Sequence, residues 1–286
     1  MAFRQRYWKR AVIGFLGIGL SAMAFGALDE TTGERLTAII KGEHRSAENK
    51  ARDIYRKPLE TLSFLGVRSD MTVVEIWPGA GWYSEILAPL LKEDGRFYAA
   101  QYNPNGPYAY QRRGFGAFLT KLGSNPSLYR DVIITEFDLP YKLRIAPAGS
   151  VDMVLTFRNV HNFVMGLYGG GAHARLGFQA IFDALKPGGV LGIVDHQWDD
   201  VEREDPLAAN GYISKERTVT LAQAVGFRLV AESKVLNNPK DTKDYPEGVW
   251  SLPPTLALGD KDKARYLPIG ESDRFLLKFT KPMADN

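Results

Sequence analysis

Cysteine is absent from this sequence of 286 residues. Its absence excludes a disulfide framework, a thiolate nucleophile and a cysteine-based zinc site. It also excludes a lipid-modified cysteine at the end of an export signal. The fold must therefore be held by its hydrophobic core, and a composition with 45% hydrophobic and 24% charged residues is typical of a globular protein that buries one.

Acidic residues are absent from residues 1–27. Four basic residues come first, an apolar run follows over 11–20, and small residues fill much of 21–27. This order is typical of a secretory signal peptide, so we expect an exported, periplasmic protein. An uncleaved inner-membrane anchor is the alternative, because 11–27 is uncharged and approaches the roughly 20 residues of a spanning helix. No twin-arginine pair precedes the apolar run, which favours the general secretion route.

Excess positive charge is also absent once this leader is set aside. The whole chain has 36 basic and 33 acidic residues, and the four basic residues of the leader leave 32 against 33 in the rest. The sequence pI of about 8.9 is therefore a property of the leader. We predict no nucleic-acid partner and expect a small-molecule ligand, with membrane contact only through an uncleaved leader.

The remaining chain alternates between two patterns. Residues 28–58 are polar with scattered apolar positions and indicate a helical extension, and a single α/β domain is predicted over 59–286. The predicted strands are 71–76, 96–100, 132–137, 151–157, 190–194, 227–233 and 273–280. The predicted helices are 58–66, 82–92, 115–122, 176–185 and 214–225. Strands that alternate with helices indicate a parallel sheet covered on both faces.

The last connection breaks this alternation. Residues 237–271 are rich in Pro, Gly, Asn and Asp and show no helical pattern. A connection of this kind allows the last strand to pair antiparallel to its neighbours. Loops of this length are uncommon in a compact domain, and apolar residues within this one favour an ordered flap over a binding site.

The first predicted strand runs into the turn Glu75-Ile-Trp-Pro-Gly-Ala-Gly81, and a helix follows. Gly79 and Gly81 allow the backbone to approach a ligand closely, and the helix start offers unpaired N–H groups. The carboxylate of Glu75 can accept from an amine or a ribose. The alternative is that a tight turn between a strand and a helix requires glycine without any ligand.

The fourth predicted strand ends in the polar segment Arg158-Asn159-Val-His161-Asn162. Ligands of open α/β sheets bind beyond the carboxyl ends of the strands. His161 can act there as a general base and Arg158 can hold an anionic group. Alternatively, Asn159 caps a turn and His161 is a core imidazole.

The fifth predicted strand ends in Asp195-His196. We expect His196 to act with His161, Asn159 and Arg158 in catalysis. A metal site built from Asp195, His196, His161 and Asp199 is conceivable, but ligands scattered over two loops do not carry one, and no metal is predicted.

These motifs together resemble a known family. The run TVVEIWPGAGWYSEILAPLL, the segment Phe157 to Asn162, the turn Lys186-Pro-Gly-Gly-Val190 and the closing Ser272-Asp-Arg-Phe275 resemble class I S-adenosylmethionine-dependent methyltransferases. The resemblance spans 45–282. More specifically, the sequence resembles a group of exported predicted methyltransferases with a Trp-Pro-Gly turn. It implies a Rossmann-like, seven-stranded, mostly parallel sheet with a reversed last strand and helices on both faces.

The resemblance also implies S-adenosylmethionine as cofactor, lined by Glu75, Gly79 and Gly81 at its methionine and ribose part. Two positions depart from the family pattern. Trp77 replaces the usual first glycine of the turn, and Gln101 replaces the usual acid at the end of the second strand. Asp138, or Glu136 in the alternative register, is the candidate for the adenine.

A nicotinamide cofactor is disfavoured by the same turn. The third glycine of the dinucleotide-binding pattern would fall on Ser84, and no acid follows at roughly 20 residues. We therefore predict a methyltransferase with an unidentified small-molecule acceptor. The alternative is a non-catalytic, ligand-binding protein of the cell envelope, because an exported enzyme needs a supply of a cofactor that is made in the cytoplasm.

Overall fold

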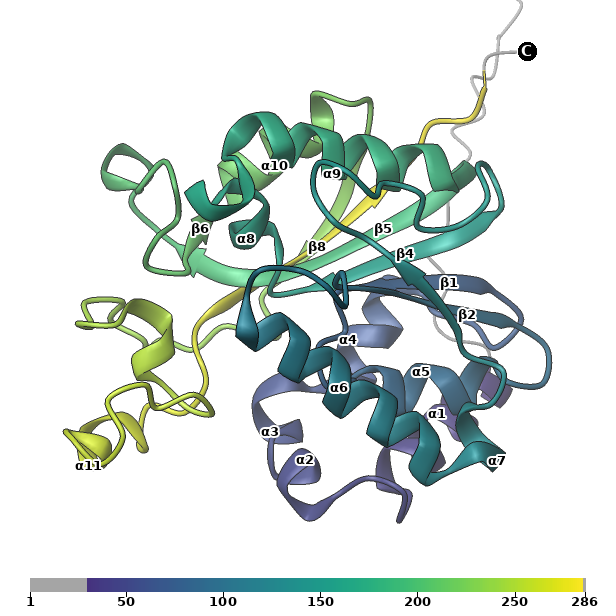
Figure 1. Cartoon of the computed structure of the whole chain (residues 1–286), viewed down its shortest axis with the longest axis horizontal. Coiled ribbons are helices and arrows are strands. Elements are labelled where there is room, and N and C mark those ends of the chain that lie inside the picture. The colour runs from purple at the N-terminus through teal and green to yellow at the C-terminus, as the bar shows by residue number, and fades with distance from the viewer. Residues whose placement is uncertain (1–29, 285–286) are drawn as a thin grey trace, which may run out of the picture.

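The computed structural model of the chain describes residues 30–284, and the leader predicted over 1–27 lies outside these residues. At its centre is a sheet with the strand order β3-β2-β1-β4-β5-β8-β7, to which β6 adds at the end of β5 (Figure 1). Its strands are β1 Thr72–Ile76, β2 Arg96–Gln101, β3 Ile133–Glu136, β4 Val151–Phe157, β5 Leu185–Trp198, β6 Ile213–Ser214, β7 Arg228–Ser233 and β8 Arg274–Thr280. The strands β8 and β5, and β8 and β7, pair antiparallel, and the remaining pairs are parallel. The predicted Rossmann-like sheet with a reversed last strand is confirmed.

Two differences from the predicted strands have local causes. The strand β5 begins at Leu185, five residues before the predicted start, because Leu185 pairs with Val151 of β4 across a register shift. It also continues to Trp198, where its end pairs with β6. The short β6 gives the sheet eight strands instead of seven. Two residues are too few to show a strand pattern in the sequence.

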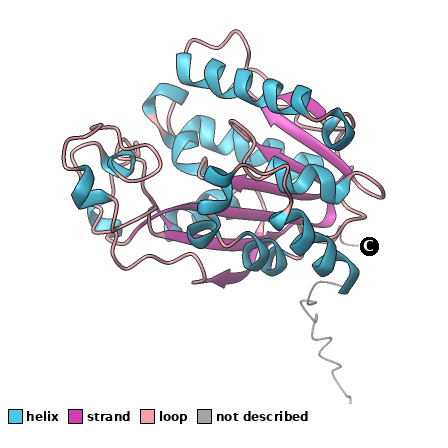
Figure 2. Cartoon of the chain, turned by 90° about the horizontal axis from the view of Figure 1, so that it is seen from below, coloured by secondary structure: helices cyan, strands magenta, loops and turns pink. Residues whose placement is uncertain are grey.

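Helices cover both faces of the sheet (Figures 1 and 2). The helices α8, α9 and α10 lie on one face, and α1, α4, α5 and α6 lie on the other. The helices are α1 Glu30–Lys41, α2 Ala47–Ala51, α3 Asp53–Arg56, α4 Pro58–Leu65, α5 Ser84–Leu91, α6 Ala109–Ser124, α7 Pro126–Tyr129, α8 Val160–Val164, α9 Gly171–Ala184, α10 Lys215–Gln223 and α11 Lys263–Tyr266. Over residues 30–284, no helix combines the length and apolar character that crossing a membrane requires.

The two faces have separate hydrophobic cores, and the central strands contribute to both by alternation. Val73, Met153 and Leu155 are fully buried in the core under α1, α4 and α5. Val74 and Val154, one position along in each strand, are fully buried in the core under α8, α9 and α10. Each such side chain contributes about 1.5–3 kcal/mol by burial. The sheet is therefore a rigid platform for the residues at its strand ends.

A buried arginine helps to hold the segment before the sheet in place. Arg45 donates from Nε to Glu85 Oε1 of α5 at 2.8 Å and from Nη1 to Asp53 Oδ2 of α3 at 2.8 Å. Its guanidinium carbon also lies 4.9 Å from the ring centroid of Trp82, whose Nε1 donates to Asn49 O at 3.1 Å. These contacts fix α2 and α3 beside the start of α5, at the carboxyl edge of the sheet.

Residues 237–271, here called the flap, project from the same edge (Figure 1). Tyr245, Leu252 and Tyr266 form a small hydrophobic cluster of its own. The expectation that this segment lacks helix is wrong, because it contains the 3-10 helix Gly248–Ser251 and the single turn α11. Both are four residues long, which is too short to give a helical periodicity in the sequence.

Candidate functional site

A cavity of about 670 Å³ lies beyond the carboxyl ends of the strands and beneath the flap. Its volume is that of a typical small-molecule site. Its lining includes the turn after β1, the end of β4 with the start of α8, the arginines Arg52, Arg56 and Arg274, and residues of the flap. Of the predicted site residues, the lining includes Glu75, Trp77, Gly79, Arg158, Asn159, His161 and His196.

The two glycines of the turn have different tasks. Gly79 has φ +59°, and a Cβ added there would meet no atom within 4 Å, so the backbone faces open space in the cavity wall. Gly81 has φ +78°, and a Cβ there would lie 2.9 Å from the Phe118 ring of α6. Gly81 does not line the cavity. Its positive φ and its close packing against α6 explain a glycine here without a ligand, and its predicted contact with the cofactor stays a prediction.

Trp77 also has a positive φ, of 44°. Residues other than glycine adopt this backbone conformation at a cost of about 1–2 kcal/mol. Its Nε1 donates to the Phe137 carbonyl at the end of β3 at 2.7 Å. The indole stacks on Tyr102 at 5.1 Å between centroids and meets the Phe163 edge at 5.2 Å. The indole thus occupies the space beyond the ends of β1, β2 and β3. Together with Tyr102 and Tyr110 it forms one end of the cavity, here called the aromatic wall.

Behind this wall, two predicted cofactor residues do not reach the cavity. The buried Gln101 donates from Nε2 to Gly79 O at 2.8 Å, and its Oε1 accepts from Tyr102 N at 3.1 Å. Asp138 accepts from Asn103 Nδ2 at 2.9 Å. Both residues hydrogen-bond within the chain and neither lines the cavity, so their predicted contacts with ribose and adenine stay predictions. Gln101 instead holds the turn at Gly79 in place.

Glu75 is the carboxylic acid at the turn end of the cavity. It is buried, and its Oε2 accepts from Ser84 Oγ at 2.6 Å. Burial raises the pKa of Glu75 to about 7, and the Ser84 hydroxyl opposes this shift. A cationic amine placed beside it would compensate the burial and favour the ionised form. Glu75 is therefore suited to accept from the amine of a bound amino acid group.

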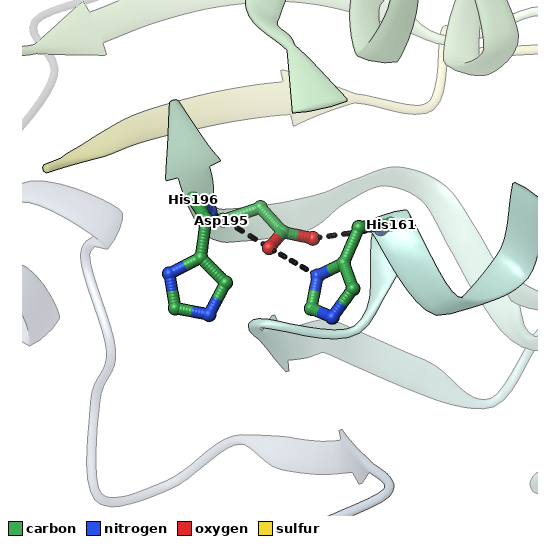
Figure 3. Close-up of side chains that lie close together, drawn as sticks. All are labelled: His161, Asp195 and His196. Carbon is green, nitrogen blue, oxygen red and sulfur yellow. Dashed lines mark hydrogen bonds and ion pairs between the residues drawn. The ribbon is translucent and has the colours of Figure 1, made fainter. Parts of the chain in front are cut away.

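His161 of α8, shortly after β4, and Asp195 of β5 form a hydrogen-bonded pair (Figure 3). The Asp195 carboxylate accepts from His161 Nδ1 at 2.7 Å, from His161 N at 3.0 Å and from His196 N at 2.7 Å. A carboxylate only accepts, so Nδ1 carries the proton and Nε2 carries the lone pair. The ring lines the cavity, and this pair has the orientation of a general base.

His196 lies beside this pair, with its ring 5.3 Å from that of His161 between centroids, and both rings extend to the same side (Figure 3). Its Nδ1 is 2.5 Å from Ser272 Oγ. Burial lowers the pKa of His196 well below its ordinary value, and His161 and Arg274 act in the same direction. His196 is therefore neutral at pH 7.

The ligand atoms of His161, Asp195 and His196 lie within 4.8 Å of one another. Asp199, the fourth residue considered for a metal, lies outside this group and pairs with Lys243. The Asp195 oxygens already accept three hydrogen bonds from the two histidines. This carboxylate orients the imidazoles, and the arrangement fits acid–base chemistry better than metal binding.

Asn159 and Arg158 lie between β4 and α8. Asn159 occupies the N-cap position of α8, but its Nδ2 donates to Ile76 O at 3.0 Å and ties the ends of β4 and β1 together. Arg158 has φ +64° and lines the cavity. Non-glycine residues with positive φ at a cavity wall store strain that the surrounding structure must hold.

Three cavity arginines were missed by sequence reasoning: Arg52, Arg56 and Arg274. Arg56 and Arg274 are buried, and all three contact the buried Glu271. Arg52 and Arg56 are four residues apart in a polar segment, a pattern that equally describes a solvated helix face. No local signal in the sequence distinguishes the two.

No protein-family model matches the sequence, and no curated protein is significantly similar to it. Solved structures share the fold. An S-adenosylmethionine-dependent methyltransferase from Aquifex aeolicus superposes with a TM-score of 0.53 at 15% identity, over 86% of this chain and 98% of the other. A Haemonchus contortus phosphoethanolamine N-methyltransferase in complex with S-adenosylmethionine gives 0.51 at 13% identity, over 87% of this chain and 60% of the other.

The cyclase SpnF also matches, with a TM-score of 0.54 at 14% identity, over 85% of this chain and 86% of the other. The chain therefore has the Rossmann-like fold of S-adenosylmethionine-dependent methyltransferases. Because the same fold occurs in a cyclase, the reaction must be argued from the site. The narrower resemblance to an exported group stays a prediction.

Proposed function

We propose that the protein is an S-adenosylmethionine-dependent methyltransferase that acts on a small-molecule acceptor in this cavity. One observation carries the proposal: the oriented His161–Asp195 pair shares the cavity with Glu75 and the open backbone of Gly79. Methyl transfer is a direct displacement, so a protein contributes chiefly alignment, exclusion of water and a base for the acceptor proton.

The residues at the turn fit the methionine part of the cofactor. Gly79 leaves the space that a side chain would fill, and Glu75 can accept from an amine. The purine would stack on the aromatic wall of Trp77, Tyr102 and Tyr110, in place of contacts with Gln101 and Asp138. The cofactor, when bound, supplies the electrophilic methyl group.

His161 then performs the proton step. Its Nε2 takes a proton from the acceptor as the acceptor attacks, and Asp195 holds the Nδ1 proton and stabilises the resulting imidazolium. The neutral His196 keeps the adjacent position free of positive charge.

The test is calorimetric titration of the purified protein with S-adenosylmethionine and with its demethylated product. We expect micromolar binding, weakened roughly tenfold or more by Gly79→Ala, because the methyl group enters the open space and strains a positive φ. Gly116→Ala, where an added Cβ also meets nothing within 4 Å, is the matched control and should bind normally. Failure of the unaltered protein to bind either compound would overturn the proposal.

His161→Ala separates binding from chemistry. We expect near-normal cofactor affinity and a loss of roughly 10²-fold or more in the transfer rate, once an acceptor is found, because only the base is removed. A large loss of cofactor affinity would instead show that His161 is structural.

The second candidate is a binding protein of the cell envelope that has kept the fold. The filled space around Trp77 and the internally bonded Gln101 favour it. Cofactor binding without turnover on any envelope extract would support this candidate over the enzyme.

Export through the leader belongs to the proposal as well, with a small-molecule partner, no nucleic acid, and the membrane contacted only through an uncleaved leader. Fractionation of cells that express the full chain checks it, since recovery in the cytoplasm would overturn export.

A further inference from the structure

Four arginines from three separate parts of the chain converge on one end of the cavity, here called the arginine end. Arg52 and Arg56 come from the region of α2 and α3, Arg158 follows β4, and Arg274 begins β8. All four line the cavity. Their convergence is a property of the folded domain, because residues more than 200 positions apart meet there.

One carboxylate faces these four guanidinium groups. Glu271 accepts from Arg52 Nε at 2.5 Å, from Arg56 Nε at 3.3 Å and from an Nη atom of Arg274. Within residues 30–284, Arg158 makes no ion pair. Among these four arginines and Glu271, positive charges outnumber negative ones by three.

The guanidinium groups also have unsatisfied hydrogen-bond donors. Four buried nitrogen atoms have no hydrogen-bond partner in the described part of the chain: Arg52 Nη2, Arg56 Nη2, Arg158 Nε and Arg274 Nε. Arg56 and Arg274 are each only 3% exposed, so bulk water does not serve these atoms freely. A network that served only to hold the fold would satisfy its buried donors.

The electrostatics agree with the geometry. Burial lowers the pKa of Arg158 to about 10, with Arg274 as the next cause. Burial, followed by Arg158, also lowers the pKa of Arg56. Glu271 opposes both shifts, so these shifts describe a buried site in which positive charge is only partly compensated.

We propose that Arg52, Arg56, Arg158 and Arg274 bind an oxyanion, either a carboxylate or a phosphate-type group, that a ligand carries into the cavity. Planar guanidinium groups match such anions bidentately. The molecule that carries this oxyanion is inferred from the proposed function. If that function holds, the oxyanion belongs either to the acceptor or to the methionine part of the cofactor, as its carboxylate.

Inorganic phosphate is the probe, because it tests the site without any cofactor. The purified full-length protein is titrated with phosphate at a constant ionic strength set by sodium chloride. We expect saturable binding and a rise in the unfolding temperature with phosphate concentration. Absence of saturable binding would overturn the proposal, whether or not S-adenosylmethionine binds.

Arg158→Gln is the most informative variant, because it removes a charge without breaking a contact to Glu271. We expect phosphate binding to weaken roughly tenfold or more. In phosphate-free buffer the variant should unfold at the same temperature as the unaltered protein or higher, because a repulsive charge is lost. A residue of merely structural importance would lower that temperature.

Arg130→Gln is the matched control, since Arg130 is an exposed arginine paired only with its neighbour Asp131. It should leave phosphate binding unchanged. Unchanged binding in Arg158→Gln as well would place the phosphate elsewhere and overturn the proposal.

The source of the oxyanion is decided by repeating the titration with saturating S-adenosylmethionine. Phosphate binding that persists assigns the arginine end to the acceptor, which is then an anionic small molecule. Competition assigns it to the cofactor carboxylate, and decarboxylated S-adenosylmethionine should then bind roughly tenfold more weakly than the parent compound.

Discussion

The two ends of the cavity are built on opposite principles. At the aromatic wall, the polar atoms near the strand ends are bonded within the chain: Trp77 to Phe137, Gln101 to Gly79 and Asp138 to Asn103. At the arginine end, four buried donors lack partners and positive charge exceeds negative charge. A site that needs no ligand to satisfy its polar groups recognises shape, whereas one with orphaned donors recognises a specific charge.

Two buried glutamates also differ, Glu75 in the turn after β1 and Glu271 among the arginines, and their pKa values are shifted in opposite directions. Burial raises the pKa of Glu75 to about 7. Burial acts in the same direction on Glu271, but Arg274, Arg56 and Arg52 outweigh it and hold the pKa of Glu271 well below its usual range. The difference shows that the neighbouring charges, and not depth alone, decide which acid is ionised at neutral pH.

The largest effect is expected for Glu271→Gln, which removes the only negative charge among the arginines that contact it. Breaking a buried ion pair from one side costs about 3–5 kcal/mol. We expect that loss in the free energy of unfolding by urea, with partial recovery in phosphate. Glu232→Gln, in an exposed pair with Lys215, should cost less than about 1 kcal/mol. Equal effects of the two variants would contradict a buried, charge-compensating role for Glu271.

Glu75→Gln should change how stability depends on pH. Because the folded pKa is raised, Glu75 contributes stability that is fully present below about pH 4.5 and is lost as pH rises through about 7. Between pH 4.5 and pH 8, we expect the free energy of unfolding of the variant to rise by up to about 3 kcal/mol relative to that of the unaltered protein. Denaturant unfolding at several pH values measures this, with the exposed Glu60→Gln as control. Parallel stability curves would show that Glu75 is ionised in the folded protein.

The smallest effect is expected for Trp77→Phe, which keeps an aromatic ring but leaves the buried Phe137 carbonyl without its donor. The expected loss is about 1–2 kcal/mol in the free energy of unfolding. Trp198→Phe is the control, because its partly exposed indole donates to a loop carbonyl at Asp200 that water can reach. Phosphate affinity should be unchanged in Trp77→Phe, and a change would show that the two ends do not act separately.

Most of the fold could be predicted because most strands contain a short apolar run between glycine, proline or polar residues. The local sequence pattern does not predict β6 or the extension of β5, because pairing partners elsewhere in the chain create them. It does not predict the helical turns of the flap, because they are too short to show a periodicity. Whether the 28–58 and 59–286 segments are separate units stays a prediction.

The site could be predicted in part for a similar reason. Residues at strand ends, such as Glu75, His161 and His196, line the cavity because topology alone places them there. Gln101 and Asp138 also lie at or just after strand ends, but their side chains hydrogen-bond to Gly79 and Asn103 and do not line the cavity. Arg52 and Arg56 gain their position from Glu271, more than 200 residues away, and no local pattern encodes that meeting.

The tetrapeptide Glu271 to Arg274 contacts the arginine end, His196 and the flap. Glu271 and Arg274 belong to the arginine end, and Ser272 contacts His196. Asp273 accepts from Asn238 N at 2.8 Å and from Lys243 Nζ at 3.1 Å, and both donors lie in the flap. These contacts run through four consecutive residues, so the arginine end, His196 and the flap are all attached to one short stretch of backbone.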